Sequence, residues 1–189
     1  HLGDRDAPKK VEPFLKTPSS LIGPGDDIIL PEDVGRVDAE AELVVVIGTR
    51  CKKVSEAQAL DYVFGYTCGN DVSARVWQKG DLQWWRAKSS DTFAPLGPYL
   101  VTDIDGSNLD IRCRINGDEV QHGNTSELIF GIPTIISTVS QVMTLEVGDI
   151  IMTGTPGIPG ELKAGGSVDV EIDEIGLLMN PVKLWCDKH

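Results

Sequence analysis

Basic residues are scarce in this sequence, and their scarcity excludes one class of partner. The 189 residues include 17 lysines and arginines against 29 aspartates and glutamates, which gives a net charge of −12. Such a balance repels a phosphate backbone, and no run of lysine or arginine compensates for it. We therefore expect no nucleic-acid partner. The surplus of carboxylates makes a divalent cation easier to hold, although most of them are expected at the solvated surface.

Cysteine is also sparse, and long hydrophobic runs are missing. The four cysteines are Cys51, Cys68, Cys113 and Cys186. They show no C-x-x-C spacing, so neither a zinc knuckle nor a disulfide framework is predicted. No apolar run approaches the roughly 18 residues that span a bilayer, and no charged-then-apolar leader precedes the first element. The sequence therefore predicts a soluble, cytoplasmic protein without a membrane partner.

Glycine and proline, by contrast, are frequent. The 20 glycines and 11 prolines divide the chain into short pieces, many of them alternating or β-branched. This pattern is typical of a mostly β protein with a few short helices and long functional loops. Strands are predicted at 27–30, 39–47, 63–68, 99–102, 109–115, 149–152, 167–172 and 177–182, helices at 54–62 and 133–141, and an active-site loop region at 73–98. Asn116-Gly117 predicts a tight hairpin.

Two glutamates open one predicted strand, in the stretch DAEAELVVVIG at 38–48. Residues two apart in a strand point to one face, so Glu40 and Glu42 project together. Neighbouring carboxylates in a partly buried setting raise one another's pKa unless a cation lies between them. The pair alone leaves two interpretations open, an exposed strand end or a metal site.

A third carboxylate, Asp71, follows a second apolar run, in the stretch GNDVSARVWQKG at 69–80. Two glutamates and an aspartate supply hard oxygen ligands suited to Mg²⁺ or Mn²⁺, with the other octahedral positions left for water or substrate oxygens. No cysteine or histidine belongs to the set, which argues against zinc. The combination favours a metal site over a strand end.

Four ordered blocks of this sequence resemble the fumarylacetoacetate hydrolase family. They are D-x-E-x-E-L-x-V-V-I-G, G-Y-x-x-x-N-D-V-S-A-R-x-W-Q, K-x-x-D-T-F-x-P-L-G-P and G-D-I-I-x-T-G-T-P, and their order and spacing match over residues 37–156. The resemblance implies a mixed β-sandwich roll and a homodimer. It also implies one catalytic domain over residues 1–189, with an N-terminal dyad and lid segment at 1–31 and the metal and substrate core at 37–156.

The resemblance further implies roles for single residues. It implies that the metal ligands are Glu40, Glu42 and Asp71. Arg75 and Gln78 match positions that face the substrate. Lys88 matches a lysine beside the metal, where a cation would stabilise developing enolate or carboxylate charge. Thr155, in TGTP, matches a residue that hydrogen-bonds a substrate carboxylate.

The first residue of the sequence also falls on a motif of this family. Members carry H-x-x-E followed by a stretch like EPFLKTPSSLIGPGDDIILP, which here is 12–31. His1 and Asp4 take the place of that dyad, with aspartate replacing glutamate, and the family's preceding G-x-N-Y element does not occur in the sequence. In the dyad, histidine acts as general base on a water and the acid orients it. The alternative is an ordinary terminal histidine.

These residues predict a Mg²⁺- or Mn²⁺-dependent hydrolase that cleaves a carbon–carbon bond in a small β-diketo acid such as an acylpyruvate. Water activated by His1 and Asp4 would attack the distal carbonyl, and metal and Lys88 would hold the departing enolate. The leading alternative is decarboxylation of oxaloacetate, or decarboxylation and isomerisation of aromatic ring-cleavage products, because the same enolate then forms without a water nucleophile. A third hypothesis is a non-catalytic keto-acid binding module, which the exchange at Asp4 favours.

Overall fold

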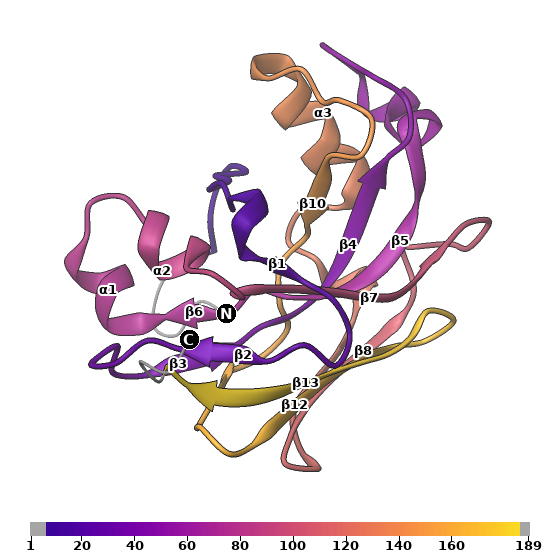
Figure 1. Cartoon of the computed structure of the whole chain (residues 1–189). Coiled ribbons are helices and arrows are strands. Elements are labelled where there is room, and N and C mark those ends of the chain that lie inside the picture. The colour runs from indigo at the N-terminus through magenta and orange to yellow at the C-terminus, as the bar shows by residue number, and fades with distance from the viewer. Residues whose placement is uncertain (1–6, 186–189) are drawn as a thin grey trace.

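The computed structural model describes residues 7–185, which form three β-sheets and a few short helices (Figure 1). The first sheet contains, in order across it, β1 (Leu21–Ile22), β7 (Ala94–Val101), β5 (Val63–Asn70), β4 (Ala41–Ile47) and β10 (Ile150–Met152). The small second sheet contains β11 (Gly160–Glu161), β3 (Val37–Ala39) and β6 (Ser73–Ala74). The third contains β2 (Ile28–Leu30), β13 (Gly176–Leu184), β12 (Ser167–Ile172), β8 (Asp110–Ile115) and β9 (Asp118–Asn124). The predicted mostly β fold with mixed sheets is confirmed.

Six short helical segments connect these strands. The α-helices are α1 (Arg75–Gly80), α2 (Trp85–Ser89) and α3 (Ile132–Val142), and the 3₁₀-helices are η1 (Pro18–Ser20), η2 (Glu56–Tyr62) and η3 (Thr125–Glu127), all within residues 7–185. None of the helices in that part of the chain is long and apolar enough to cross a membrane. Figure 1 shows α1 and α2 near β6 of the second sheet, whereas α3 lies away from them and packs against η2.

The two large sheets share one hydrophobic core. Leu43 and Val45 of β4 belong to the same buried cluster as Val170 of β12 and Leu178 of β13. Burial of such a side chain contributes about 1.5–3 kcal/mol to folding, so this cluster fixes the two sheets face to face. Because β4 lies at the centre of this packing, the carboxylates at its start are carried on a rigid element.

The predicted strand at 39–47 divides at Glu40. Upstream of it, β3 pairs antiparallel with β6 and β11, whereas β4 pairs antiparallel with β5 and β10. The chain therefore passes from the second sheet to the first at this residue. Glu40 therefore lies between the end of β3 in the second sheet and the start of β4 in the first.

The prediction of an irregular loop region at 73–98 is wrong. These residues form β6, α1, α2 and the first half of β7, which begins at Ala94. Helices of six and five residues are too short for a hydrophobic period to be read from the sequence, and helices this short depend on tertiary contacts for stability. The predicted helix at 133–141 and the hairpin at Asn116-Gly117, where both residues have positive φ, are confirmed.

Candidate metal and substrate site

Three carboxylates converge where the first and second sheets join. Glu40 lies between β3 and β4, Glu42 is the second residue of β4, and Asp71 directly follows β5. All three are buried, and one oxygen of each lies within 4.8 Å of the others. The antiparallel pairing of β4 with β5 sets Ala41 opposite Asn70, and the Asp71 N–H donates to the Glu40 carbonyl at 2.9 Å. Strand register therefore produces the convergence that the sequence predicted.

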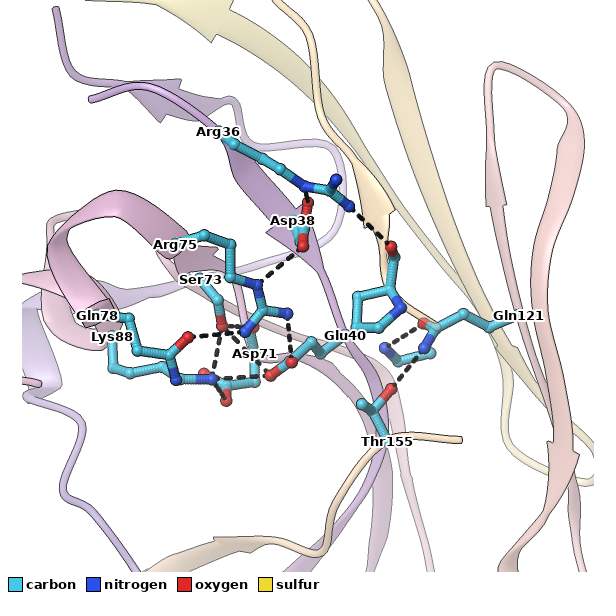
Figure 2. A network of polar contacts seen from close by, with 12 residues as sticks. Arg36, Asp38, Glu40, Asp71, Ser73, Arg75, Gln78, Lys88, Gln121 and Thr155 are labelled. Carbon is cyan, nitrogen blue, oxygen red and sulfur yellow. Dashed lines mark hydrogen bonds and ion pairs between the residues drawn. The ribbon is translucent and has the colours of Figure 1, made fainter. Parts of the chain in front are cut away.

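Lys88, in α2, brings a buried ammonium group into this cluster (Figure 2). Its side chain donates to Glu40 Oε2 at 2.7 Å and to Ser73 Oγ at 2.5 Å, and it also contacts Asp71 Oδ2. Burial alone would lower the pKa of Lys88, but Asp71 and Glu40 outweigh burial and raise it. Lys88 therefore stays protonated at neutral pH and lies beside Glu40 and Asp71.

A second lysine, Lys16, reaches the cluster from the N-terminal segment. Its Nζ donates to Asp71 Oδ1 at 2.6 Å and also contacts the carbonyl of Lys88. Burial tends to raise the pKa of Asp71, but Lys16 and Lys88 overcome this tendency and lower it to about 2. Sequence reasoning missed Lys16, because it lies 55 residues from Asp71 and no local pattern connects them.

Glu42 has a different environment from its two neighbours. Its Oε2 accepts a hydrogen bond from the Gly154 N–H at 2.6 Å, and within residues 7–185 no lysine or arginine side chain pairs with it. Burial, followed by repulsion from Asp71 and Glu40, raises the pKa of Glu42 to about 8. A cation among the three oxygens would remove this repulsion, and an all-carboxylate set suits Mg²⁺ or Mn²⁺. The donor set therefore fits a divalent metal.

The predicted substrate residues Arg75 and Gln78 lie beside Glu40 in α1. Arg75 Nη2 donates to Glu40 Oε1 at 2.5 Å and Arg75 Nη1 donates to Gln78 Oε1 at 2.9 Å. Arg75 Nε donates to Asp38 Oδ2 at 2.8 Å, and Asp38 is a further buried acid that sequence reasoning missed. The alternation of Asp38, Glu40 and Glu42 was the available signal, since residues two apart in extended chain share a face.

Thr155 lies on the loop after β10 and is held by Gln121, another residue that sequence reasoning missed. Gln121 Nε2 donates to Thr155 Oγ1 at 3.0 Å and to the Pro156 carbonyl at 2.6 Å. The Gln121 Oε1 accepts from the Ala41 N–H at 3.1 Å. One buried amide therefore ties the Thr155 loop to the start of β4, between the two glutamates (Figure 2).

A cavity of about 1280 Å³ adjoins the carboxylate cluster at Glu42. Glu42 and Thr155 line it from the sheet side, and Phe14 and Lys16 line it from the N-terminal segment. A cavity of this kind has room for a small organic acid next to the carboxylates. The predicted dyad of His1 and Asp4 lies outside the described residues.

Comparison with known proteins agrees with this architecture. Residues 1–183 match the family model described as Fumarylacetoacetate (FAA) hydrolase C-terminal. The mitochondrial oxaloacetate tautomerase fahd2 of Xenopus laevis is 47% identical over 196 residues, which cover 96% of this chain and 61% of that protein.

Two solved structures share the fold over most of this chain. A 5-carboxymethyl-2-hydroxymuconate delta-isomerase from Mycobacterium smegmatis is 46% identical, with a TM-score of 0.93, over 95% of this chain and 72% of its own. Maleylpyruvate hydrolase from Sphingobium sp. SYK-6, in complex with manganese(II) ion and pyruvate, is 39% identical, with a TM-score of 0.85, over 92% of this chain and 64% of its own. The predicted fold class is confirmed.

Proposed function

This chain belongs to the fumarylacetoacetate hydrolase family, and from that premise we propose that it is the catalytic part of a divalent-metal-dependent enzyme acting on a small 2-oxo acid. The names of the three relatives above have a 2-oxo or 2-hydroxy acid in common. Acids of this class form an enol or enolate whose oxygen is on C2, the carbon that bears the carboxylate. The catalytic requirement is therefore to stabilise negative charge on one oxygen.

The observation that carries the proposal is the buried cluster of three carboxylates. Glu40, Glu42 and Asp71 would hold Mg²⁺ or Mn²⁺. When bound, the cation would supply Lewis-acid polarisation of the oxygens of the 2-oxo acid. The manganese(II) ion in the maleylpyruvate hydrolase relative supports this assignment.

The protein's own residues would bind and orient the acid. Lys88 keeps its proton at neutral pH, so it acts as a fixed positive charge for the enolate oxygen and not as a base. The Thr155 hydroxyl, held by Gln121, would hydrogen-bond the substrate carboxylate at the cavity wall. His1 and Asp4 remain the proposed acid–base pair.

We propose enol–keto isomerisation as the reaction. The C3–H bond of the 2-oxo acid breaks, its electron pair forms the C2–C3 double bond, and the oxygen on C2 takes up a proton. The tautomerase and isomerase relatives, at 47% and 46% identity, are more similar to this chain than the maleylpyruvate hydrolase, at 39%. Isomerisation therefore takes precedence over the hydrolysis that the sequence alone favoured.

Hydrolysis of a carbon–carbon bond in an acylpyruvate is the second candidate. The complex of maleylpyruvate hydrolase with manganese(II) ion and pyruvate favours it, because pyruvate is the enolate-derived product of such a cleavage. Decarboxylation of oxaloacetate would use the same enolate stabilisation. The three reactions differ in the bond that breaks and not in the charge that must be stabilised.

Product analysis separates these reactions. The protein is incubated with oxaloacetate or acetylpyruvate and Mg²⁺ or Mn²⁺, while enol absorbance is followed in the ultraviolet and pyruvate is measured by a coupled assay. Faster enol–keto exchange of oxaloacetate without pyruvate release is the expected result. Pyruvate from acetylpyruvate would indicate hydrolysis, and pyruvate from oxaloacetate would indicate decarboxylation. No reaction with either metal would contradict the enzymatic assignment, and Glu42→Gln and EDTA serve as inactive controls.

A further inference from the structure

Asp38 is a buried acid that lies next to the carboxylate cluster but outside it. Asp38 is 3% exposed and lies in the middle of β3, opposite Ser73 of β6 and Glu161 of β11. Its two oxygens are both used: Oδ1 accepts from Arg36 Nε at 2.7 Å and Oδ2 accepts from Arg75 Nε at 2.8 Å. Because Asp38 is buried and both of its oxygens are paired, it constrains the positions of the two arginine side chains that donate to it.

Arg75 divides its hydrogen bonds among three acceptors. The Nε–H points to Asp38, the Nη2 group points to Glu40 Oε1 at 2.5 Å, and the Nη1 group points to Gln78 at 2.9 Å (Figure 2). A guanidinium is a rigid planar fork, so fixing Nε also fixes the direction of the two Nη groups. Asp38 therefore determines which part of Arg75 meets Glu40.

Glu40 is held from two sides by this arrangement. Arg75 donates to its Oε1, while Lys88 donates to its Oε2 at 2.7 Å. Without Asp38, the Nε–H of a largely buried arginine would lack its acceptor, and the side chain would rotate to satisfy it elsewhere. Glu40 would then keep only the bonds that Lys88 and Ser73 make to its Oε2, and Oε1 could turn away from the position in which the oxygens of Glu40 meet those of Glu42 and Asp71.

We propose that Asp38 is a positioning residue of the metal site, which acts through Arg75 to hold the Glu40 carboxylate in place for the cation. The proposal rests on the function proposed above, because it takes the three carboxylates as metal ligands. Groups that hydrogen-bond and orient the ligands of a metal typically change its affinity by about 10–100-fold when they are removed. Asp38 would contact the ligand Glu40 only through Arg75, so we expect its removal to change metal affinity by the lower end of that range.

The test is the dissociation constant for Mn²⁺, measured by isothermal titration calorimetry without substrate. Asp38→Ala is expected to weaken binding about tenfold in the unaltered background and less than about twofold in an Arg75→Met background. A direct electrostatic effect of Asp38 on the cation would instead persist without Arg75. The double-mutant cycle therefore separates positioning from charge.

Asp38→Asn provides a second distinction, because it removes the charge but keeps a carbonyl acceptor for Arg75. Its Mn²⁺ affinity is expected to stay nearer to that of the unaltered protein than to that of Asp38→Ala. Glu171→Gln is the matched control, since it also removes one negative charge and one arginine ion pair, on β12. Circular dichroism checks folding, and Asp38→Leu, which fills the vacated volume, replaces Asp38→Ala if the latter does not fold.

Two results would overturn the inference. One is unchanged Mn²⁺ affinity in folded Asp38→Ala or Asp38→Leu, and the other is an equal loss with and without Arg75. Failure of the proposed function has a different signature: the unaltered protein would then bind no Mn²⁺, or Glu42→Gln would bind it as well as the unaltered protein does. That signature would remove the basis of the inference together with the metal site.

Discussion

At the residue scale, the three carboxylates of the cluster have unequal surroundings. Asp71 lies between two ammonium groups, and despite the opposing effect of burial its pKa falls to about 2. Glu42 is close enough to be repelled by both neighbours but pairs with no cationic side chain within residues 7–185, and its pKa rises to about 8. Lys16 and Lys88 therefore offset the charge of Asp71, whereas at Glu42 a bound proton or a cation would relieve the repulsion.

Replacement of Glu42 should separate folding from metal binding. Glu42→Gln keeps an acceptor for the Gly154 N–H and removes the charge that burial penalises. At pH 8 in EDTA, its melting temperature is expected to equal or exceed that of the unaltered protein, while the rise caused by Mg²⁺ is lost. Differential scanning fluorimetry checks both values. A full Mg²⁺-induced rise in Glu42→Gln would contradict the role of this residue.

Lys88 should affect turnover more than binding. Lys88→Met removes the fixed positive charge proposed for the enolate oxygen, so kcat is expected to fall about 10²–10³-fold. Steady-state kinetics with saturating Mn²⁺ measure the effect. Lys183→Met, which removes an exposed lysine paired with Asp27, is the control and should retain normal rates. A fall of less than threefold in Lys88→Met would contradict the assignment.

At the element scale, the N-terminal segment is fastened to α2 beside the cluster. The Thr17 N–H donates to Ser89 Oγ at 3.2 Å, and Ser89 Oγ donates to the Leu15 carbonyl at 3.2 Å. The Phe14 ring lies 4.7 Å from the Lys88 ammonium, and Lys16 bonds Asp71. This segment thus covers Lys88 and forms one wall of the cavity.

Loss of Lys16 should loosen that wall. In Lys16→Ala, amide hydrogens of residues 14–17 are expected to exchange faster by mass spectrometry, because the segment loses its ion pair to Asp71 and keeps its bonds to Ser89 and its Phe14 ring contacts. KM is expected to rise several-fold more than kcat changes, since the cavity wall would no longer be fixed. Lys10→Ala is the matched control, because Lys10 lies in the same segment but pairs with exposed Glu12. Equal exchange in both variants would argue against the fastening role.

The sequence predicted the strands and helices that show a local residue pattern, and it missed the features that depend on contacts between distant segments. Apolar and acidic residues alternate at 37–42 without a break at Glu40. The sequence therefore does not show that the chain changes its partner strands there. The convergence of the three carboxylates could be predicted because Glu40 and Glu42 are two residues apart and Asp71 directly follows the neighbouring strand. Lys16 and Gln121 were not found, because their contacts join segments 55 and 34 residues apart without a pattern.

At the scale of the whole molecule, the stability of the metal-free protein should depend on pH through Glu42, and a bound metal should reduce that dependence. The pKa of Glu42 rises from 4.5 to about 8 on folding, so the stability from its bound proton is complete below 4.5 and is lost as pH rises through about 8. Metal-free protein is therefore expected to melt at lower temperature at pH 8.5 than at pH 6, and saturating Mg²⁺ should reduce this difference. Thermal melts in EDTA and in Mg²⁺ test this, with Glu42→Gln showing a weaker pH dependence.

The net charge of −12 is a property of the whole chain and does not locate the site. Composition predicted no nucleic-acid partner and favoured a cation, whereas the ordered sequence blocks identified the family and predicted the ligands. The reaction could not be predicted in the same way, since isomerisation, hydrolysis and decarboxylation need the same stabilised enolate. Only the bound substrate and its products distinguish them.

The central claim, that Glu40, Glu42 and Asp71 hold the catalytic metal, is tested most directly by a crystal structure with Mn²⁺ and oxalate, an analogue of the enolate. Anomalous scattering from manganese is expected as one peak among these three carboxylates, with oxalate on the side of the cavity that Thr155 lines. A manganese peak elsewhere, or none at saturating Mn²⁺, would contradict the account.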